Sequence, residues 1–283
     1  MEYKFLKMII EIELKKEVEV ISRFSGGMSN YTVLVKIDGK LYTYRIPGKN
    51  SSVFIDREVE YANLELIKNL ELNCDNIYFN KVNGHKIAEY IEGEDLSSFS
   101  VDLNIVSELL LKLHNSGIVA VNDYDVIKRI DYYESLLKYP VSEQFSELKN
   151  KLPIMFKEFE KYPKVFCHGD AQKANWINSD RLYLLDWEYS GNNDPYYDIA
   201  CFGNANFEDA IELLNCYLKR TPNNEEMRRL ITNRMAQCLQ WHNVALYKEQ
   251  IGLSKELKVN FKEVSKKYVL KAKELYELYK KYE

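Results

Sequence analysis

The stretch that decides the fold is residues 164–202, KVFCHGDAQKANWINSDRLYLLDWEYSGNNDPYYDIACF. Its segments VFCHGD, ANWIN and LYLLDW are short β-forming runs joined by polar turns, whereas the sequence on both sides has mainly helical periodicity. The helices predicted around it cover 102–116, 125–139, 142–161, 204–219, 225–250 and 254–282. A polar, non-helical segment between helices is a common place for functional side chains.

The residues before the turn at Glu92-Gly93-Glu94 predict a smaller α+β region. β-Branched and aromatic runs at 18–24, 31–37 and 41–46 predict three strands, and two shorter strands are expected at 76–81 and 85–91. A helix is predicted over 56–71, with Asp56 suited to its N-cap. We therefore expect an α+β fold with two lobes. The N-terminal lobe, 1–92, has a small antiparallel sheet and one long helix, and the C-terminal lobe, 93–283, is mostly helical.

Composition and charge exclude several classes of protein. The 283 residues are 46% hydrophobic, enough to fill a sizeable core. The net charge of −4 argues against a nucleic-acid partner, and no run of about 18 apolar residues predicts a membrane span. The five cysteines are scattered, with no CxxC pair, so a zinc site or disulfide framework is not expected and a cytoplasmic location fits best.

The strongest chemical signal is HGDAQKAN at 168–175. Asp170 stands five residues before Asn175, the spacing of the H-R-D-L-x-x-x-N loop of kinases. In such a loop the carboxylate orients the attacking hydroxyl, and the amide oxygen reaches a metal ion on the phosphates. Asp186 stands 16 residues after Asp170, directly after an apolar strand. A metal-binding carboxylate is expected at that position. Mg²⁺ prefers such oxygen ligands.

The predicted N-terminal lobe adds a third element. Arg45 lies on the third strand, where kinases carry a phosphate-binding lysine, and Glu60 lies on the following helix as its ion-pair partner. A loop containing Gly27, Ser29 and Asn30 joins the first two strands, where a nucleotide-covering loop is expected. There is no GxxxxGK[ST] motif, which disfavours a P-loop enzyme. Each feature alone is common, and their agreement in order and position carries the phosphotransferase prediction.

The same residues resemble the choline/ethanolamine kinase family, within the aminoglycoside-phosphotransferase and protein-kinase-like superfamily, and among its members the bacterial choline kinases of the phosphocholine pathway. The resemblance covers about residues 20 to 250. Its matching segments are GGMSNYTVLV (26–35), YTYRIPG (42–48), IDREVEYANLELI (55–67), YIEGEDL (90–96), HGDAQKANW (168–176) and LDWEYSGNNDPYYDIA (185–200). Asp186-Trp187-Glu188-Tyr189-Ser190 is the most discriminating, because antibiotic kinases usually lack its Glu-Tyr-Ser.

The resemblance implies a two-lobed kinase-like fold, ATP and Mg²⁺ as cofactors, and transfer of the γ-phosphoryl group of ATP to the hydroxyl of choline. By position, it implies that Asp170 is the catalytic base and that Asn175 and Asp186 hold magnesium. It also implies that Arg45, supported by Glu60, contacts the phosphates. The remaining implied roles are adenine binding by the backbone of Glu89 to Ile91, and bracing of the loop by His168.

The choline acceptor favours aromatic faces, because its quaternary ammonium cannot donate an N–H hydrogen bond. The resemblance places Trp241 and Tyr197 in the acceptor pocket, with Trp187, Tyr189 and Glu188 as further candidates. Where family members often carry a second tryptophan, this chain has Val244. The acceptor is thus choline, or alternatively ethanolamine, a sugar or an aminoglycoside. The alternative to an enzyme is a binding module, a catalytically silent protein with the kinase fold that binds ligands without turning them over. The oligomeric state stays open.

Overall fold

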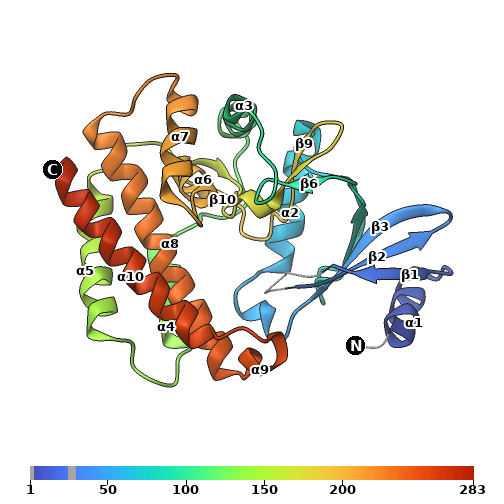
Figure 1. Cartoon of the computed structure of the whole chain (residues 1–283). Helices are drawn as coiled ribbons and strands as arrows, with labels where there is room; N and C mark the ends of the chain where they lie inside the picture. Colours follow the sequence, from blue (N-terminus) through green and yellow to red (C-terminus); the bar gives the residue numbers. More distant parts are fainter. Residues whose placement is uncertain (1–2, 25–29) are drawn as a thin grey trace. The chain divides into compact units, whose positions relative to one another are not determined.

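The computed structural model describes residues 3–24 and 30–283 and divides the chain into two compact units (Figure 1). The first unit comprises residues 1–99 and 176–188, and the second comprises 100–175 and 189–283. These units differ from the predicted lobes in the placement of 93–99 and 176–188. The lobe boundary at residue 92 stays a prediction.

The first unit is built on a five-stranded antiparallel sheet, which confirms the predicted α+β class. In spatial order its strands are β1 (Glu19–Arg23), β2 (Asn30–Ile37), β3 (Lys40–Pro47), β5 (Lys86–Glu89) and β4 (Asn76–Phe79). Helix α2 (Arg57–Ile67) begins at Asp56, whose side chain accepts hydrogen bonds from the N–H groups of Glu58 and Val59. All five predicted strands and this helix are therefore present.

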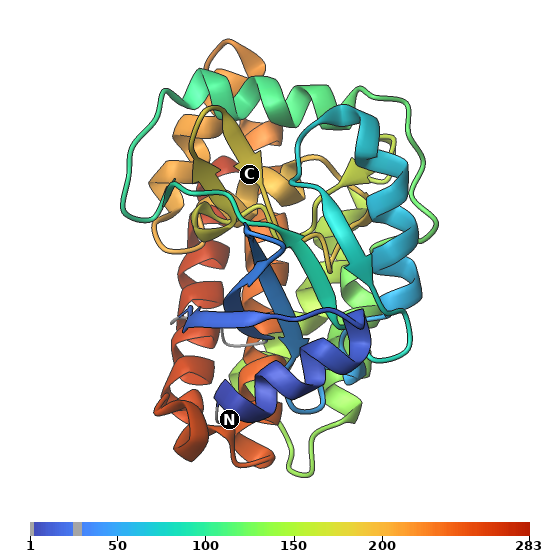
Figure 2. The same ribbon diagram turned by 90° about the vertical axis from the view of Figure 1, so that its right-hand side faces the viewer.

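The structure adds a helix to this unit that the sequence analysis does not predict, α1 (Tyr3–Leu14). Leu6 and Ile10 lie one helical turn apart and pack against Val33, Val35 and Tyr44 of the sheet. Figure 2 shows the helix lying against the strands of this sheet. The signal that could have found α1 is this i, i+4 apolar spacing between charged residues.

Residues 176–188 complete the first unit with a small second sheet. The strands of this sheet are, in spatial order, β6 (Glu94–Asp95), β8 (Trp176–Asn178) and β9 (Leu182–Leu184). The N–H of Leu184 donates to the carbonyl of Leu72 at 2.8 Å, which attaches this ribbon to the segment after α2. Asp186 therefore belongs to the same compact unit as the five-stranded sheet.

The second unit is mainly helical, as expected, and contains one two-stranded ribbon, β7 (Val165–Cys167) with β10 (Gly191–Asn193). Its helices are α3 (Leu103–His114), α4 (Val126–Ser135), α5 (Glu143–Lys157), α6 (Tyr196–Phe202), α7 (Phe207–Leu218), α8 (Asn224–Gln250), α9 (Leu253–Leu257) and α10 (Phe261–Tyr279). Helices α8 and α10 lie side by side along much of their length (Figure 1).

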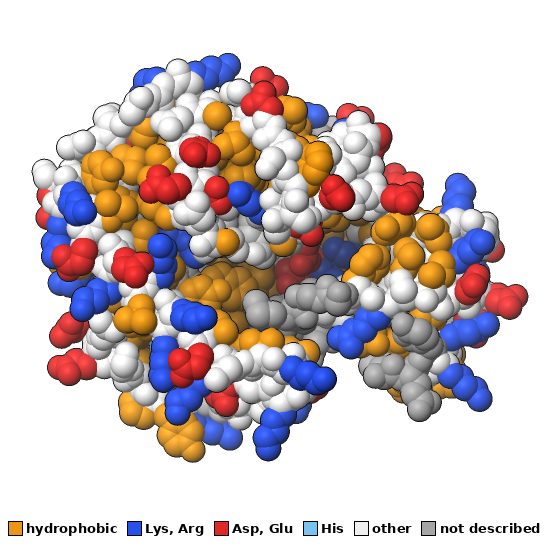
Figure 3. All heavy atoms as spheres, in the orientation of Figure 1, with side chains coloured by type: hydrophobic (Ala, Val, Ile, Leu, Met, Phe, Trp, Pro, Cys, Tyr) orange, Lys and Arg blue, Asp and Glu red, His pale blue; other side chains and the backbone are white. Residues whose placement is uncertain are grey.

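Two differences from the predicted helices have local causes. The helix predicted over 254–282 is divided between α9 and α10, because Lys258 adopts a left-handed conformation with φ of 56° and Asn260 caps a new helix. Helix α6 lies within the stretch predicted to be non-helical. The described residues contain no helix long and apolar enough to span a membrane. On the face drawn in Figure 3, acidic and basic side chains are interspersed.

Candidate active site

The catalytic loop predicted at 168–175 is held in the second unit by Asp198. Strand β7 ends at Cys167, and the N–H groups of His168 and Gly169 each donate to the Asp198 carboxylate at 2.8 Å. Gly169 has φ of 79°, and a Cβ there would lie 2.1 Å from the carbonyl oxygen of Tyr189. Only glycine fits this turn, because it needs both the left-handed conformation and the close backbone approach.

Asp170 and Asn175 contact each other directly within this loop. The Nδ2 group of Asn175 donates to the backbone carbonyl of Asp170 at 2.7 Å and to its Oδ2 at 3.1 Å. Gln172 Nε2 also donates to that Oδ2, at 3.0 Å. These bonds fix the orientation of the carboxylate.

His168 contacts the backbone of the loop directly, and its bracing role stays a prediction. Its Nδ1 accepts a hydrogen bond from the N–H of Asp170 at 3.1 Å, and its ring is wholly buried. The hydrogen bond fixes the backbone of Asp170 relative to the ring, as that role requires.

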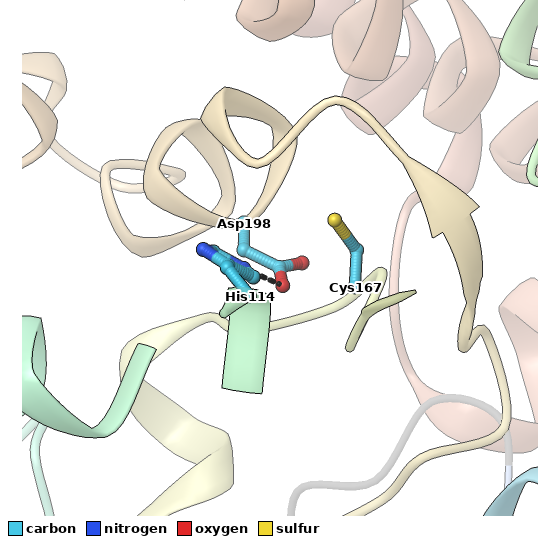
Figure 4. Close-up of side chains that lie close together, drawn as sticks. All are labelled: His114, Cys167 and Asp198. Atoms are coloured by element: carbon cyan, nitrogen blue, oxygen red, sulfur yellow. Dashed lines mark hydrogen bonds and ion pairs between the residues drawn. The ribbon is translucent and has the colours of Figure 1, made fainter. Parts of the chain in front are cut away.

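Behind the loop lies a buried group of three side chains, His114, Cys167 and Asp198 (Figure 4). His114 Nε2 lies 3.1 Å from Asp198 Oδ2, which also accepts the N–H of His168. Burial, followed by the nearby Asp198 charge, raises the pKa of the Cys167 thiol well above its ordinary value. Because a protonated thiol is a poor metal ligand, this group fits a brace for the loop better than a metal centre. Sequence reasoning gave His114 and Asp198 no role.

Asp186 lies just beyond strand β9 of the first unit. It is a non-glycine residue with φ of 67°, a conformation that costs free energy and that is common at functional sites. Its side chain is 36% exposed, although the adjacent Trp187 is wholly buried and donates from Nε1 to the carbonyl of Leu184 at 2.7 Å. Trp187 therefore holds the turn from inside the core and has no exposed ring face for an acceptor.

Arg45 and Glu60 form the ion pair that the sequence analysis expects. The contact is bidentate: Arg45 Nη1 lies 2.8 Å from Glu60 Oε1, and Arg45 Nη2 lies 2.8 Å from Glu60 Oε2. Arg57 and Lys86 approach the same carboxylate at 2.6 and 3.4 Å. Burial acts to raise the pKa of Glu60, but the charges of Arg45 and Lys86 outweigh it and hold that pKa well below its usual range.

Glu188 belongs to this ion network in the first unit. Its Oε2 lies 3.0 Å from Nη1 of Arg57 and accepts from Asn30 Nδ2 at 3.1 Å. Arg45 Nη1 is 3.2 Å from Asp186 and 3.5 Å from Glu188. Burial and then the charge of Asp186 raise the pKa of Glu188. In this structure Glu188 pairs with arginines, and its contact with the acceptor stays a prediction.

The structure describes only some of the other residues that are expected to bind the nucleotide. Asn30 contacts Glu188, whereas Gly27 and Ser29 lie outside the described residues. At the expected adenine segment, Glu89 ends strand β5 and its N–H donates to the carbonyl of Asp75, while Ile91 is partly buried.

The expected acceptor residues of the second unit separate into two groups. Tyr189 and Trp241 form an edge-to-face pair with ring centroids 5.6 Å apart, and Trp241 is partly exposed. Tyr197 is only 1% exposed, and its hydroxyl donates to Tyr124 Oη at 3.1 Å. Tyr197 thus packs in the interior in this structure. Val244, in place of an aromatic residue, is also buried.

Comparison with known proteins gives consistent results. A family model described as Choline/ethanolamine kinase matches residues 21–281. Protein LicA of Haemophilus influenzae is 32% identical over 248 residues, covering 80% of this chain and 73% of the relative. Two crystal structures are similar over nearly the whole chain. LicA in complex with AMP has 27% identity and a TM-score of 0.78, covering 96% of this chain and 98% of that one. The choline kinase LicA of Streptococcus pneumoniae has 28% identity and a TM-score of 0.75, covering 94% and 98%.

Proposed function

The chain belongs to the choline/ethanolamine kinase family, a family of kinases that phosphorylate an alcohol, and on that premise we propose that its reaction is phosphorylation of choline by Mg-ATP. The products are phosphocholine and ADP. The observation that carries the proposal is the direct contact of Asn175 with Asp170 in a loop fixed by Asp198. That contact keeps the Asp170 carboxylate and the Asn175 amide side by side in one loop, which supports their assignment to the base and to the metal ion.

Asp170 is the proposed catalytic base. The acceptor oxygen forms a bond to the γ-phosphorus while the bond from that phosphorus to the ADP oxygen breaks, and the hydroxyl proton passes to the Asp170 carboxylate. Two amide donors on Oδ2 hold that carboxylate in a single orientation. Catalysis then consists of positioning the hydroxyl in line and stabilising charge.

Asp186 and Asn175 are assigned to magnesium, because a carboxylate and an amide oxygen are the hard ligands that this ion prefers. When bound, the ion neutralises charge on the phosphates. Arg45 is assigned to the phosphates, with Glu60 holding its guanidinium. Nε of Arg45 is buried and has no hydrogen-bond partner among the described residues, so this donor is not consumed by the ion network.

Adenine is assigned to the backbone between Glu89 and Ile91, with Gly27, Ser29 and Asn30 over the phosphates. The AMP in the crystal structure of LicA supports an adenine nucleotide as the donor. Tyr189 and Trp241 are assigned to the ammonium group of the acceptor, whose cation favours ring faces. We place the reaction in the cytoplasm, in keeping with five free cysteines.

The test is release of ADP from Mg-ATP with choline, ethanolamine, a panel of sugars and kanamycin. We expect saturable turnover with choline, and a loss of at least about a hundredfold in kcat for Asp170→Asn. Asp180→Asn is the matched control, because Asp180 is an exposed acid in the same segment of the chain. Substantial kcat in Asp170→Asn would remove Asp170 from the role of base, and nucleotide binding without turnover of any acceptor would favour the silent binding module.

Ethanolamine is the second candidate acceptor, and Val244 favours it. An aliphatic side chain buried at this position leaves one ring fewer for a trimethylammonium group. A higher kcat/KM for ethanolamine than for choline would support this assignment and would leave the phosphoryl-transfer chemistry unchanged.

A further inference from the structure

A cation already lies against the aromatic residues of the second unit. The aromatic cluster consists of two ring pairs, Tyr124 with Tyr197 and Tyr189 with Trp241, and Arg129 lies against one ring of each pair. The guanidinium carbon of Arg129 is 4.2 Å from the centroid of the Tyr124 ring and 6.0 Å from that of Tyr189. Tyr189 packs edge to face on Trp241, so Arg129 is one ring away from Trp241. Arg129 comes from α4 and Trp241 from α8, two helices that pack together.

Among the residues that the structure describes, no carboxylate forms an ion pair with the positive charge of Arg129. Its hydrogen bond goes to the neutral hydroxyl of Tyr133 at 3.1 Å, and the ion pairs found over residues 3–24 and 30–283 include none to Arg129. The preceding residue behaves differently, since Lys128 is 85% exposed and pairs with Asp125. An arginine stays protonated at every physiological pH. The charge at the aromatic cluster is therefore permanent.

We propose that Arg129 is a specificity-determining residue that weakens the binding of cationic acceptors by placing its own charge on the aromatic cluster. The inference rests on the proposed assignment of Tyr189 and Trp241 to the acceptor ammonium. Ring faces attract a cation through their quadrupole, and Arg129 already uses this attraction at Tyr124. A second cation bound several ångströms away pays like-charge repulsion, which at a partly buried site suffices for about a tenfold change in affinity.

The effect acts on charge and not on shape, so it can be isolated with two acceptors of one shape. Choline and its neutral carbon isostere, 3,3-dimethylbutan-1-ol, differ in a single atom and in charge. The ratio of their kcat/KM values reports how strongly the enzyme prefers the cation. A purely structural role for Arg129 would change both kcat/KM values together and leave the ratio unchanged.

The experiment measures this ratio by ADP release for the wild-type chain and for Arg129→Gln, Arg129→Lys and Lys128→Gln. We expect Arg129→Gln to raise the choline-to-isostere ratio about tenfold, which is about 1.4 kcal/mol. Arg129→Lys keeps the charge and is expected to stay near the wild-type ratio. Lys128→Gln removes the same charge from an exposed position and is expected to change the ratio less than twofold. Thermal melting checks folding, and Arg129→Met replaces the Gln variant if that variant does not fold.

The outcomes separate the two proposals. If the wild-type chain phosphorylates choline but the neutral variants of Arg129 leave the ratio unchanged or lower it, the inference is overturned and the proposed function stands. An equal change in Lys128→Gln would also overturn it, because the effect would then be one of general charge. If the wild-type chain phosphorylates neither compound, the proposed function fails and the inference fails with it.

Discussion

Replacing Glu60 by glutamine tests the buried ion network of the first unit most directly. Glu60 is only 1% exposed, and each of its oxygens has two cationic donors. Oε1 faces Arg45 Nη1 and Lys86, and Oε2 faces Arg45 Nη2 and Arg57. Whichever way a glutamine amide is turned, its NH2 group opposes two donors. The variant therefore loses two charge-assisted hydrogen bonds and one buried negative charge, a cost of about 3–5 kcal/mol.

Urea unfolding followed by circular dichroism measures this free energy. Glu58→Gln is the matched control, because Glu58 is exposed on the same helix and its loss is expected to cost less than about 1 kcal/mol. A loss of less than about 1 kcal/mol for Glu60→Gln would refute the reasoning, since it would mean that the three cations do not depend on this carboxylate. Turnover is expected to fall as well, because Arg45 loses its bidentate ion pair with the Glu60 carboxylate.

The pH dependence of the same pair of proteins follows from the lowered pKa of Glu60. In the unfolded chain Glu60 has its ordinary pKa near 4.5, and in the folded chain the pKa is well below that value. Its stabilisation is therefore fully present above about pH 4.5 and decreases as the pH falls toward the folded-state pKa. We expect the difference in unfolding free energy between wild type and Glu60→Gln to narrow progressively below pH 4.5. A difference that widens there would contradict the assigned sign.

Three further predictions concern the proposed catalytic groups. Gly169→Ala brings a Cβ within 2.1 Å of a backbone oxygen and is expected to lower the free energy of unfolding in urea by more than about 3 kcal/mol. The control Gly117→Ala, with φ of 71° and open space around it, should lower it by about 1 kcal/mol. Equal losses in the two variants would contradict the steric argument. Asp198→Asn turns an amide donor toward at least one N–H of the loop. We therefore expect kcat to fall at least about tenfold while the KM for ATP stays unchanged. An unchanged kcat would show that Asp198 does not position the loop. Chelation of divalent ions should abolish turnover until Mg²⁺ is restored, and Asp186→Ala should raise the Mg²⁺ concentration needed for half-maximal rate; activity in excess chelator would count against the metal assignment.

The elements predicted correctly are those that local patterns specify. Alternating apolar residues gave the strands of the five-stranded sheet, and Asp56 gave the start of α2. The Asp170–Asn175 contact was also predictable, because both residues lie in one short loop and their separation along the chain limits their separation in space. Helix α1 was missed although Leu6 and Ile10 have the i, i+4 apolar spacing of an amphipathic helix, because the charged residues around them count in the sequence analysis only as evidence against an apolar leader segment.

The contacts that could not be predicted join residues far apart in the sequence. Arg57 meets Glu188 across 131 positions, and His114 meets Asp198 across 84. A charged residue on a helix is normally solvated, so nothing local shows that Arg57 will be buried beside two carboxylates. Tyr197 is the opposite case, since a residue expected in the acceptor pocket is enclosed by the packing of Tyr124.

The sequence by itself determined the α+β class, most helices and strands, the family, and the loop that brings Asp170 and Asn175 together. The class, the elements and the loop depend on periodicity or on spacing within a short segment, whereas the family was identified by the resemblance of its motifs, above all Asp186-Trp187-Glu188-Tyr189-Ser190. The tertiary structure alone decided which cations surround Glu60, that Asp198 holds the loop, and that Arg129 lies over the Tyr124 ring. The physical reason is that burial and charge pairing depend on which distant segments pack together, and a local sequence pattern carries no record of that packing.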